Sequence, residues 1–446
     1  MRSINSFKNI TISIAAQLII ALLGFVSRKV FLDSLGAEYL GVNGLLENVL
    51  SILALVESGI GTSIIYHLYK PLAEKNLPKI IALVRLYKKA YAVIAIVVLI
   101  LSLTLYPFLG NIMKNSAEIR YLEFIYFLFI AKNMMYYLNA HKVSLINADQ
   151  KGYILARINF VFQAVMTIAK IIVLLMTKNY VFYLILELCL FLIQNIVNGR
   201  IVLKHYSFLN TKSNFTIDKL EKKSLTQNIK ASFFHNLGGY IVFGTDNILI
   251  SSFIGLSTVG LYSNYLMIVG QLSALVTPIL GGIGSSVGNL IAVESKEKSY
   301  EIFKVTYLVN FWIYSVCAIF LYNVLEPFIS WWLGTGYLLD SLTFIVILLN
   351  FYITGLRASI LMFKIKGGIF VQDKYVPLIE AAINLGASLI LVRYIGLAGI
   401  FIGTTLSTLI TVFWNAPRLV YRHIFNKPVR DYFYNYLIYL ILTIIT

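Results

Sequence analysis

Long apolar stretches separated by short polar breaks dominate the pattern along the chain. A membrane-spanning helix needs about 20 mostly apolar residues, and stretches of this length recur from end to end. The first predicted spans are Asn9–Phe31, Val42–Leu68, Ala90–Leu109, Tyr121–Ile146, Tyr153–Met176 and Tyr180–Leu203. The later ones are Ala231–Phe253, Val259–Val293, Val305–Leu325, Leu342–Phe363, Tyr375–Val392, Leu397–Ala416 and Tyr432–Thr446. The pattern therefore predicts an all-α integral membrane protein with 12 to 14 transmembrane helices, the last of them partial or missing.

Composition and charge agree with a membrane protein. Hydrophobic residues make up 59% of the chain and the mean hydropathy is +0.80, whereas ordinary soluble domains contain about 45–50% apolar residues. The net charge of +17 comes from Lys and Arg scattered over many short loops, which indicates membrane topology rather than nucleic-acid binding. The Lys/Arg bias of alternate loops predicts a cytoplasmic N-terminus. Cys189 and Cys317 both lie in apolar runs, so no disulfide framework or metal knuckle is indicated.

Sequence motifs of enzymes are absent. The chain has no H-E-x-x-H, Walker or G-x-S-x-G motif and no Cys/His cluster with metal-ligand spacing. We therefore expect no catalytic residues, no metal and no cofactor. Transport is the function class that remains.

An internal repeat is predicted at an offset of about 219 residues. The segment Leu35–Gly41 aligns with Ile254–Gly260, and each segment joins one apolar run to the next. On this register both halves have the same topology. The predicted domains are an N-terminal bundle at 1–203, a cytoplasmic linker at 204–230, a C-terminal bundle at 231–416, and a basic loop with an additional partial helix at 417–446.

Ionisable residues inside predicted spans are candidate functional residues, because a charge in the bilayer is costly. Cations outnumber carboxylates among them. The candidate substrate-binding cations are Arg28, Lys29, Lys132, Lys170 and Arg357, and the candidate gating or coupling carboxylates are Asp246 and Glu57.

A cavity lined by these cations suits an anionic, phosphate-bearing substrate. Lys132 is the deepest of them, since it lies about 18 Å beyond Arg120 at roughly 1.5 Å per residue. Arg28, Lys170 and Arg357 lie nearer the ends of their spans. For these three residues, the alternative that the long side chain extends to the lipid headgroups stays open. In the repeat register Asp246 aligns next to Arg28, and an ion pair between them that gates the cavity is a further hypothesis.

Several motifs together resemble one family. They are Arg28–Phe31 with Leu35–Val42, Glu57–Thr62 with Tyr69–Leu72, Thr245–Ser251 with Val259–Tyr265, and Glu380–Leu385 with Gly396–Thr404. These segments resemble the polysaccharide-transporter (Wzx-type) branch of the multidrug/oligosaccharidyl-lipid/polysaccharide (MOP) superfamily, over essentially the whole chain. The resemblance implies a fold like that of the multidrug and toxic-compound exporters (MATE), with two six-helix bundles around a central cavity.

The resemblance also implies a function and a location. The expected function is translocation of undecaprenyl-pyrophosphate-linked repeat units of capsule, exopolysaccharide or O-antigen by alternating access. The protein would lie in the bacterial cytoplasmic membrane, with a polysaccharide polymerase and other assembly proteins as candidate partners.

Three other functions stay open. A flippase for lipid II or a teichoic-acid precursor would need the same kind of site. A cation-coupled multidrug exporter should favour carboxylates in its cavity, and the surplus of basic groups argues against it. A membrane glycosyltransferase or polymerase would need catalytic groups in a sizeable outer loop, and the predicted outer loops are short.

Overall fold

The computed structural model describes residues 2–53, 57, 67–72, 74–113, 119–149, 151–211, 244–369 and 372–446. Within these residues every regular element is helical, which confirms the all-α prediction. Eight of the described helical segments are long and apolar enough to cross a membrane. The chain forms two compact units, one of residues 1–240 with 255–260 and the other of residues 241–254 with 261–446.

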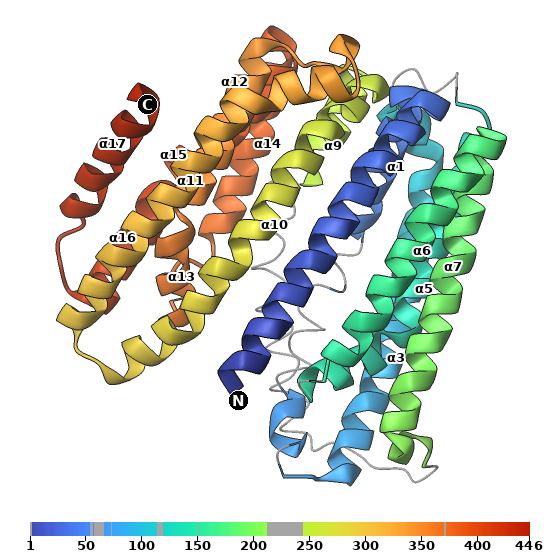
Figure 1. Cartoon of the computed structure of the whole chain (residues 1–446), viewed down its shortest axis with the longest axis horizontal. Coiled ribbons are helices and arrows are strands. Elements are labelled where there is room, and N and C mark those ends of the chain that lie inside the picture. Colours follow the sequence, from blue (N-terminus) through green and yellow to red (C-terminus); the bar gives the residue numbers. More distant parts are fainter. Residues whose placement is uncertain are drawn as a thin grey trace. The chain divides into compact units, whose positions relative to one another are not determined.

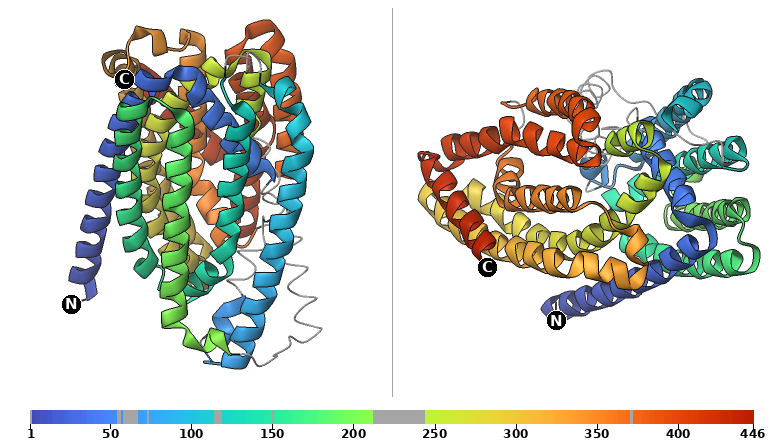
Figure 2. Two further views of the ribbon diagram at one scale, coloured as in Figure 1. Left: turned by 90° about the vertical axis from the view of Figure 1, so that its right-hand side faces the viewer. Right: turned by 90° about the horizontal axis from the view of Figure 1, so that it is seen from above.

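The first unit is built from long helices that pack lengthwise. The long helices are α1 (Arg2–Leu53), α3 (Leu77–Leu105), α5 (Leu122–Ala148), α6 (Tyr153–Thr177) and α7 (Tyr180–His205), and the short helices η2 (Tyr106–Phe108), α4 (Leu109–Ile112) and η4 (Ser207–Asn210) follow α3 or α7. Figures 1 and 2 show α5, α6 and α7 running side by side, and α7 contacts both of the others.

Both ends of α5, α6 and α7 agree with the predicted spans within a few residues, but the start of α3 does not. The helix begins at Leu77 rather than at Ala90, because Asn76 accepts a hydrogen bond from the Lys79 amide and Pro78 stands in the first turn. Both features are typical of helix starts. The basic segment before Ala90 is therefore helical and not a loop.

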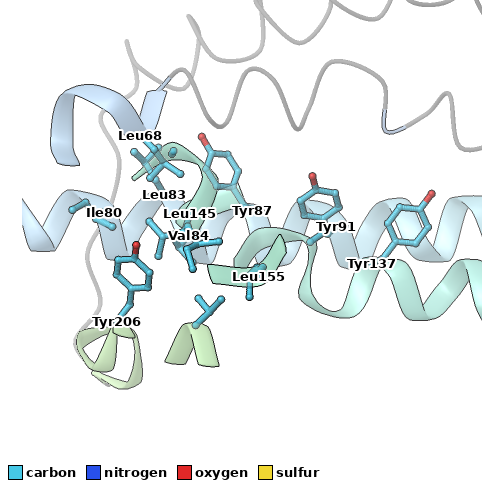
Figure 3. Close-up of a cluster of buried hydrophobic side chains, with 14 of the residues drawn as sticks. Leu68, Ile80, Leu83, Val84, Tyr87, Tyr91, Tyr137, Leu145, Leu155 and Tyr206 are labelled. Carbon is cyan, nitrogen blue, oxygen red and sulfur yellow. The ribbon is translucent and has the colours of Figure 1, made fainter. Parts of the chain in front are cut away.

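Buried side chains from four helices join the first unit together (Figure 3). Tyr87 and Tyr91 of α3 pack with Tyr137 and Leu145 of α5, and Leu155 of α6 joins the same cluster. In a membrane such packing holds helices together mainly through close van der Waals contact. The cluster fixes the positions of α5 and α6, which carry Lys132 and Lys170.

The second unit is also helical throughout its described residues. Its elements are α9 (Asp246–Phe253), α10 (Leu256–Val293, of which 256–260 count with the first unit), α11 (Lys296–Trp332), η5 (Thr335–Tyr337), α12 (Ser341–Leu356), α13 (Ala358–Lys366), α14 (Val376–Ile395), α15 (Leu397–Ile410), α16 (Val412–Val420), η6 (Tyr421–Phe425) and α17 (Arg430–Ile445). Of the predicted span Ala231–Phe253, residues 231–243 lie outside the described residues.

The predicted span Leu342–Phe363 is broken in two at Arg357. This residue ends α12 and begins α13. A break leaves backbone carbonyls without helical partners, and Asn310 of α11 donates hydrogen bonds from Nδ2 to the carbonyls of Gly355 and Leu356, at 2.9 and 3.1 Å. The break is therefore stabilised by a neighbouring helix, which a pattern of apolar residues along one span does not predict.

Polar side chains at helical spacing join α14 to α15. Glu380 accepts a hydrogen bond from Thr408 at 3.1 Å, Asn384 donates to Thr404 at 2.9 Å, and Ser388 donates to the carbonyl of Ile400 at 2.9 Å. Gly403 permits this contact, because a Cβ there would lie 2.2 Å from the Ser388 hydroxyl. Such small and polar residues are common glue between membrane helices.

The predicted repeat appears in the backbone at four glycines. Gly36 interrupts α1 with φ 85°, and its repeat partner Gly255 lies between α9 and α10 with φ 146°, values that favour glycine.

Within the first unit, a Cβ on Gly41 would lie 1.9 Å from the carbonyl oxygen of Leu256. A Cβ on Gly260 would lie 2.0 Å from that of Ala37. Because Ala37 and Leu256 are themselves aligned in the predicted repeat, the two contacts are reciprocal.

Candidate functional site

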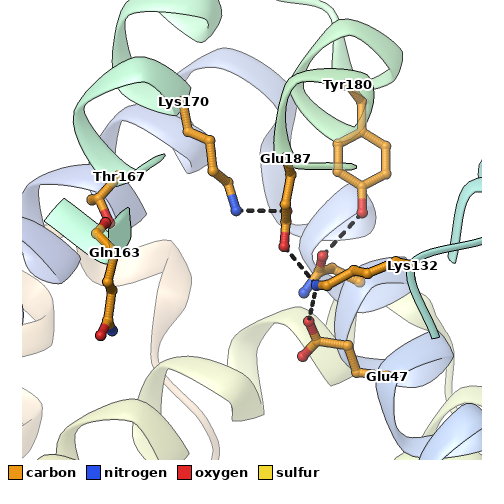
Figure 4. A network of polar contacts seen from close by, with 8 residues as sticks. Glu47, Lys132, Gln163, Thr167, Lys170, Tyr180 and Glu187 are labelled. Carbon is orange, nitrogen blue, oxygen red and sulfur yellow. Dashed lines mark hydrogen bonds and ion pairs between the residues drawn. The ribbon is translucent and has the colours of Figure 1, made fainter. Parts of the chain in front are cut away.

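Glu187 binds two lysines at once in the first unit (Figure 4). One carboxylate oxygen of Glu187, on α7, lies 2.5 Å from Lys132 Nζ of α5, and the other lies 2.6 Å from Lys170 Nζ of α6. Glu47 of α1 lies 3.8 Å from the same Lys132 ammonium. Four helices thus bring their charged side chains to one point of the bundle.

Aromatic and amide side chains hold this charged cluster in place. Tyr180, on the first turn of α7, donates a hydrogen bond from its hydroxyl to Asn43 of α1 at 3.2 Å. The Lys170 ammonium lies 4.2 Å from the ring centre of Tyr183, a favourable cation–π distance. Arg28 of α1 lies close enough to Tyr183 and Glu47 to interact electrostatically with both. Three cations therefore surround two carboxylates.

The charged side chains of the cluster differ in exposure. The side chains of Glu187 and Lys170 are 10% and 15% exposed, while those of Lys132 and Glu47 are 30% and 53% exposed. Lys132 and Glu47 are therefore the more exposed part of the cluster, and Glu187 and Lys170 are the more buried part.

A row of polar side chains on α6 leads toward the lysines. Asn159, Gln163, Thr167 and Lys170 follow one another at intervals of three or four residues, which places them on one helix face. Asn159 Oδ1 accepts hydrogen bonds from Gln194 and Asn198 of α7, at 2.8 and 2.9 Å. Gln163 is exposed, and Thr167 and Lys170 are partly exposed. Polar groups at such positions in a membrane helix typically line a path for a polar substrate.

Three of the predicted cations, Arg28, Lys132 and Lys170, lie in this part of the first unit. Lys170 is mostly buried and forms an ion pair with Glu187. Lys29 is exposed on α1. Glu57 is partly buried and faces the hydroxyl of Tyr91.

Sequence reasoning overlooked Glu187 and Glu47, the two carboxylates of the cluster. Glu187 lies inside the predicted span Tyr180–Leu203, so the rule that identified the lysines could have found it too. The sequence does not show which residues pair, because Glu187 lies 17 residues from Lys170 and 55 residues from Lys132 along the chain.

The remaining candidates, Arg357 and Asp246, belong to the second unit. Arg357 is 6% exposed, and its Nε and Nη1 have no hydrogen-bond partner among the described residues. Glu380, Tyr432 and Tyr436 interact with it electrostatically. Its guanidinium is thus buried among residues of the second unit.

Asp246 begins α9 and is 7% exposed, with one oxygen unpartnered within the described residues. Because Arg28 and Asp246 lie in different units, the proposed ion pair between them stays a prediction.

The cluster around Glu187 has the chemistry of an oxyanion site. Two ammonium groups that share one carboxylate can also share a phosphate, and charge-assisted hydrogen bonds of this kind are strong. Among the described residues, no group of three or more His, Cys, Asp or Glu side chains could hold a metal ion.

Comparison with solved structures identifies the fold. The lipid II flippase MurJ in an inward closed conformation matches with a TM-score of 0.65 and 14% identity, over 98% of this chain and 92% of that one. A mutant of the Vibrio cholerae MATE transporter VcmN matches with a TM-score of 0.60 and 14% identity, over 91% and 93% of the two chains.

A MOP-superfamily transporter from Pyrococcus furiosus, whose binding pocket is described as having reverse polarity, matches with a TM-score of 0.58 and 12% identity, over 91% and 93%. At these identities the similarity shows a MATE-like and MurJ-like fold.

Sequence comparison identifies the family. The comparison with curated proteins gave no match. Residues 6–283, which include the whole Lys132–Lys170–Glu187 cluster, match the family described as polysaccharide biosynthesis protein. This multi-pass membrane protein with a MATE-like fold therefore belongs to the polysaccharide biosynthesis protein family.

Proposed function

We propose that this protein translocates undecaprenyl-pyrophosphate-linked oligosaccharide repeat units from the cytoplasmic to the outer leaflet of a bacterial cytoplasmic membrane. The observation that carries the proposal is the pair Lys132 and Lys170, bridged by Glu187 within a bundle of membrane helices. Membership of the polysaccharide biosynthesis family and the MATE-like and MurJ-like fold support it. The substrate would be a lipid that carries a diphosphate and sugars.

The diphosphate is the part of this substrate that the lysines suit. A diphosphate presents several anionic oxygens on two phosphorus atoms, and two ammonium groups held by one carboxylate lie close enough to contact neighbouring oxygens. Lysine binds phosphate as a compact point charge with three donors. Arg28 adds a third positive charge next to the site.

The row of polar groups on α6 suits the sugars. Gln163 and Thr167 offer an amide and a hydroxyl on the same helix face as Lys170, and both groups form hydrogen bonds with sugar hydroxyls. The polyprenyl tail can remain in the bilayer while the head group passes along polar side chains. A carrier of this kind needs no catalytic residue.

The charge of the site bears on the rival functions. A cation-coupled drug exporter is less well supported, because cations outnumber carboxylates in the cluster. Flipping of lipid II is the second candidate, favoured by a fold similarity to the lipid II flippase that covers 98% of the chain. Lipid II has the same kind of diphosphate, so the glycan distinguishes the two candidates and the lysines do not.

Deletion of the gene, followed by analysis of the lipid-linked glycans in each leaflet, tests the proposed function. We expect a complete repeat unit on undecaprenyl pyrophosphate to accumulate on the cytoplasmic side, because synthesis continues while translocation stops. Accumulation of lipid II would favour the second candidate. Accumulation of incomplete glycans would show that the protein acts in sugar transfer, and the proposal would be wrong.

We also propose that the N-terminus is cytoplasmic, on the basis of the Lys/Arg bias of alternate loops. The loop between α11 and α12 should then face outward. In a variant without Cys189 and Cys317, Gly336→Cys should react with a membrane-impermeant maleimide on intact cells, since a Cβ there has no neighbour within 4 Å. Labelling only after the cells are opened would contradict this orientation.

A further inference from the structure

Glu187 occupies the position between the lysines that the proposed function assigns to a phosphate. Its two oxygens lie 2.5 Å from Lys132 Nζ and 2.6 Å from Lys170 Nζ, one oxygen to each ammonium. A carboxylate with one oxygen on each of two cations has the contact pattern of two phosphate oxygens on the same cations. The carboxylate of Glu187 thus already occupies the place between the two ammonium groups.

The other charged and titratable groups around Glu187 do not take its place. Glu47 of α1 lies 3.8 Å from Lys132 and is 53% exposed, so water screens its charge. Arg28 of α1 interacts with Tyr183 and Glu47. Tyr180 donates its hydroxyl proton to Asn43. Glu187 is therefore the buried counter-ion of both lysines.

We propose that Glu187 is an internal competitor of the substrate diphosphate. In the empty carrier it compensates the charges of Lys132 and Lys170, so that the return step does not leave two ammonium groups unpaired inside the membrane, which would be costly. In the loaded carrier it competes with the diphosphate for the same ammonium protons and so speeds substrate release. This role rests on the proposed function. It implies that Glu187 lowers the affinity for the substrate and raises the rate of turnover.

Glu187→Gln tests the competition. Glutamine keeps the size of the side chain but removes the negative charge, so the lysines are left to the ligand. We expect the purified full-length Glu187→Gln variant to bind farnesyl diphosphate, a soluble polyprenyl diphosphate, about 10- to 100-fold more tightly than the unmodified protein does, because one nearby negative charge is removed. In reconstituted vesicles the maximal rate of lipid-linked oligosaccharide transport should fall, because release is slower.

A matched control and a second variant complete the experiment. Glu123→Gln removes an exposed carboxylate from the first turn of α5 and should leave the affinity unchanged. The double variant Lys170→Met with Glu187→Gln removes one charge of each sign, so the net charge of the cluster is unchanged and Lys132 keeps Glu47 at 3.8 Å. Its affinity should lie within about threefold of the unmodified protein, well above that of Lys170→Met alone.

The outcomes separate the two proposals. If the unmodified protein binds farnesyl diphosphate but Glu187→Gln binds it no more tightly, Glu187 does not compete and the inference is wrong. The same holds if the double variant binds as weakly as Lys170→Met. If neither the unmodified protein nor any variant binds the diphosphate, the lysine site itself is wrong and the proposed function loses its main support.

Discussion

Replacing Lys170 with methionine should reduce translocation of the lipid-linked oligosaccharide about 10- to 100-fold. A hydrogen bond to a charged group contributes about 1.5–3 kcal/mol, and each 1.4 kcal/mol corresponds to about a factor of ten. Methionine has a similar length and fills the same space, and Glu187 keeps Lys132 as a partner at 2.5 Å. The bundle should therefore fold while the site loses one of its phosphate donors. The measurement is the amount of complete repeat unit that remains in the cytoplasmic leaflet of cells that carry only the variant.

Lys178→Met is the matched control for this prediction. Lys178 follows α6 directly, is exposed, and lies outside the cluster around Glu187. The Lys178→Met variant should translocate the substrate at the same rate as the unmodified protein. Equal translocation by Lys170→Met and the unmodified protein, at equal protein levels, would remove Lys170 from the binding site.

Replacing Gly41 with valine should prevent the first unit from folding correctly. A Cβ at this position would lie 1.9 Å from the carbonyl oxygen of Leu256, and a backbone atom cannot rotate away as the end of a flexible side chain can. Overpacking of this kind costs on the order of 3 kcal/mol or more. We expect little monodisperse protein from membranes, and a lower unfolding temperature for what is recovered. Gly260→Val should behave in the same way, because its Cβ would lie 2.0 Å from the carbonyl of Ala37.

Gly270→Val provides the comparison. Gly270 lies inside α10, and a Cβ there would have no neighbour within 4 Å. Because glycine is the weaker helix former, valine should change the stability by only about 0.5 kcal/mol. If Gly41→Val and Gly270→Val purify equally well and unfold at the same temperature, the close contact at Gly41 does not stabilise the first unit.

The sequence predicts most of the helices because a membrane helix depends on the hydrophobicity of a continuous run of residues. The α5, α6 and α7 helices begin and end within a few residues of the predicted spans. The breaks are harder to predict, since they depend on partners elsewhere in the chain. The break at Arg357 needs Asn310 of another helix to satisfy its carbonyls, and no local signal reports that contact.

The candidate site was predictable in its residue types but not in its pairing. Lys132 and Lys170 stand out because charges are rare in apolar runs. The sequence predicts cations available to bind a ligand, whereas the structure places the carboxylate of Glu187 between the two lysines. That difference changes the expected behaviour of the site from simple attraction to competition.

The most direct test of the account is translocation by the purified protein alone. Vesicles that contain only this protein and a labelled undecaprenyl-pyrophosphate oligosaccharide would be assayed for exposure of the sugar to an external reagent. We predict fast exposure with the unmodified protein and a rate close to that of protein-free vesicles when Lys132 and Lys170 are both methionine. Equal rates for the unmodified protein and the double variant would contradict the claim that these lysines carry the diphosphate across the membrane.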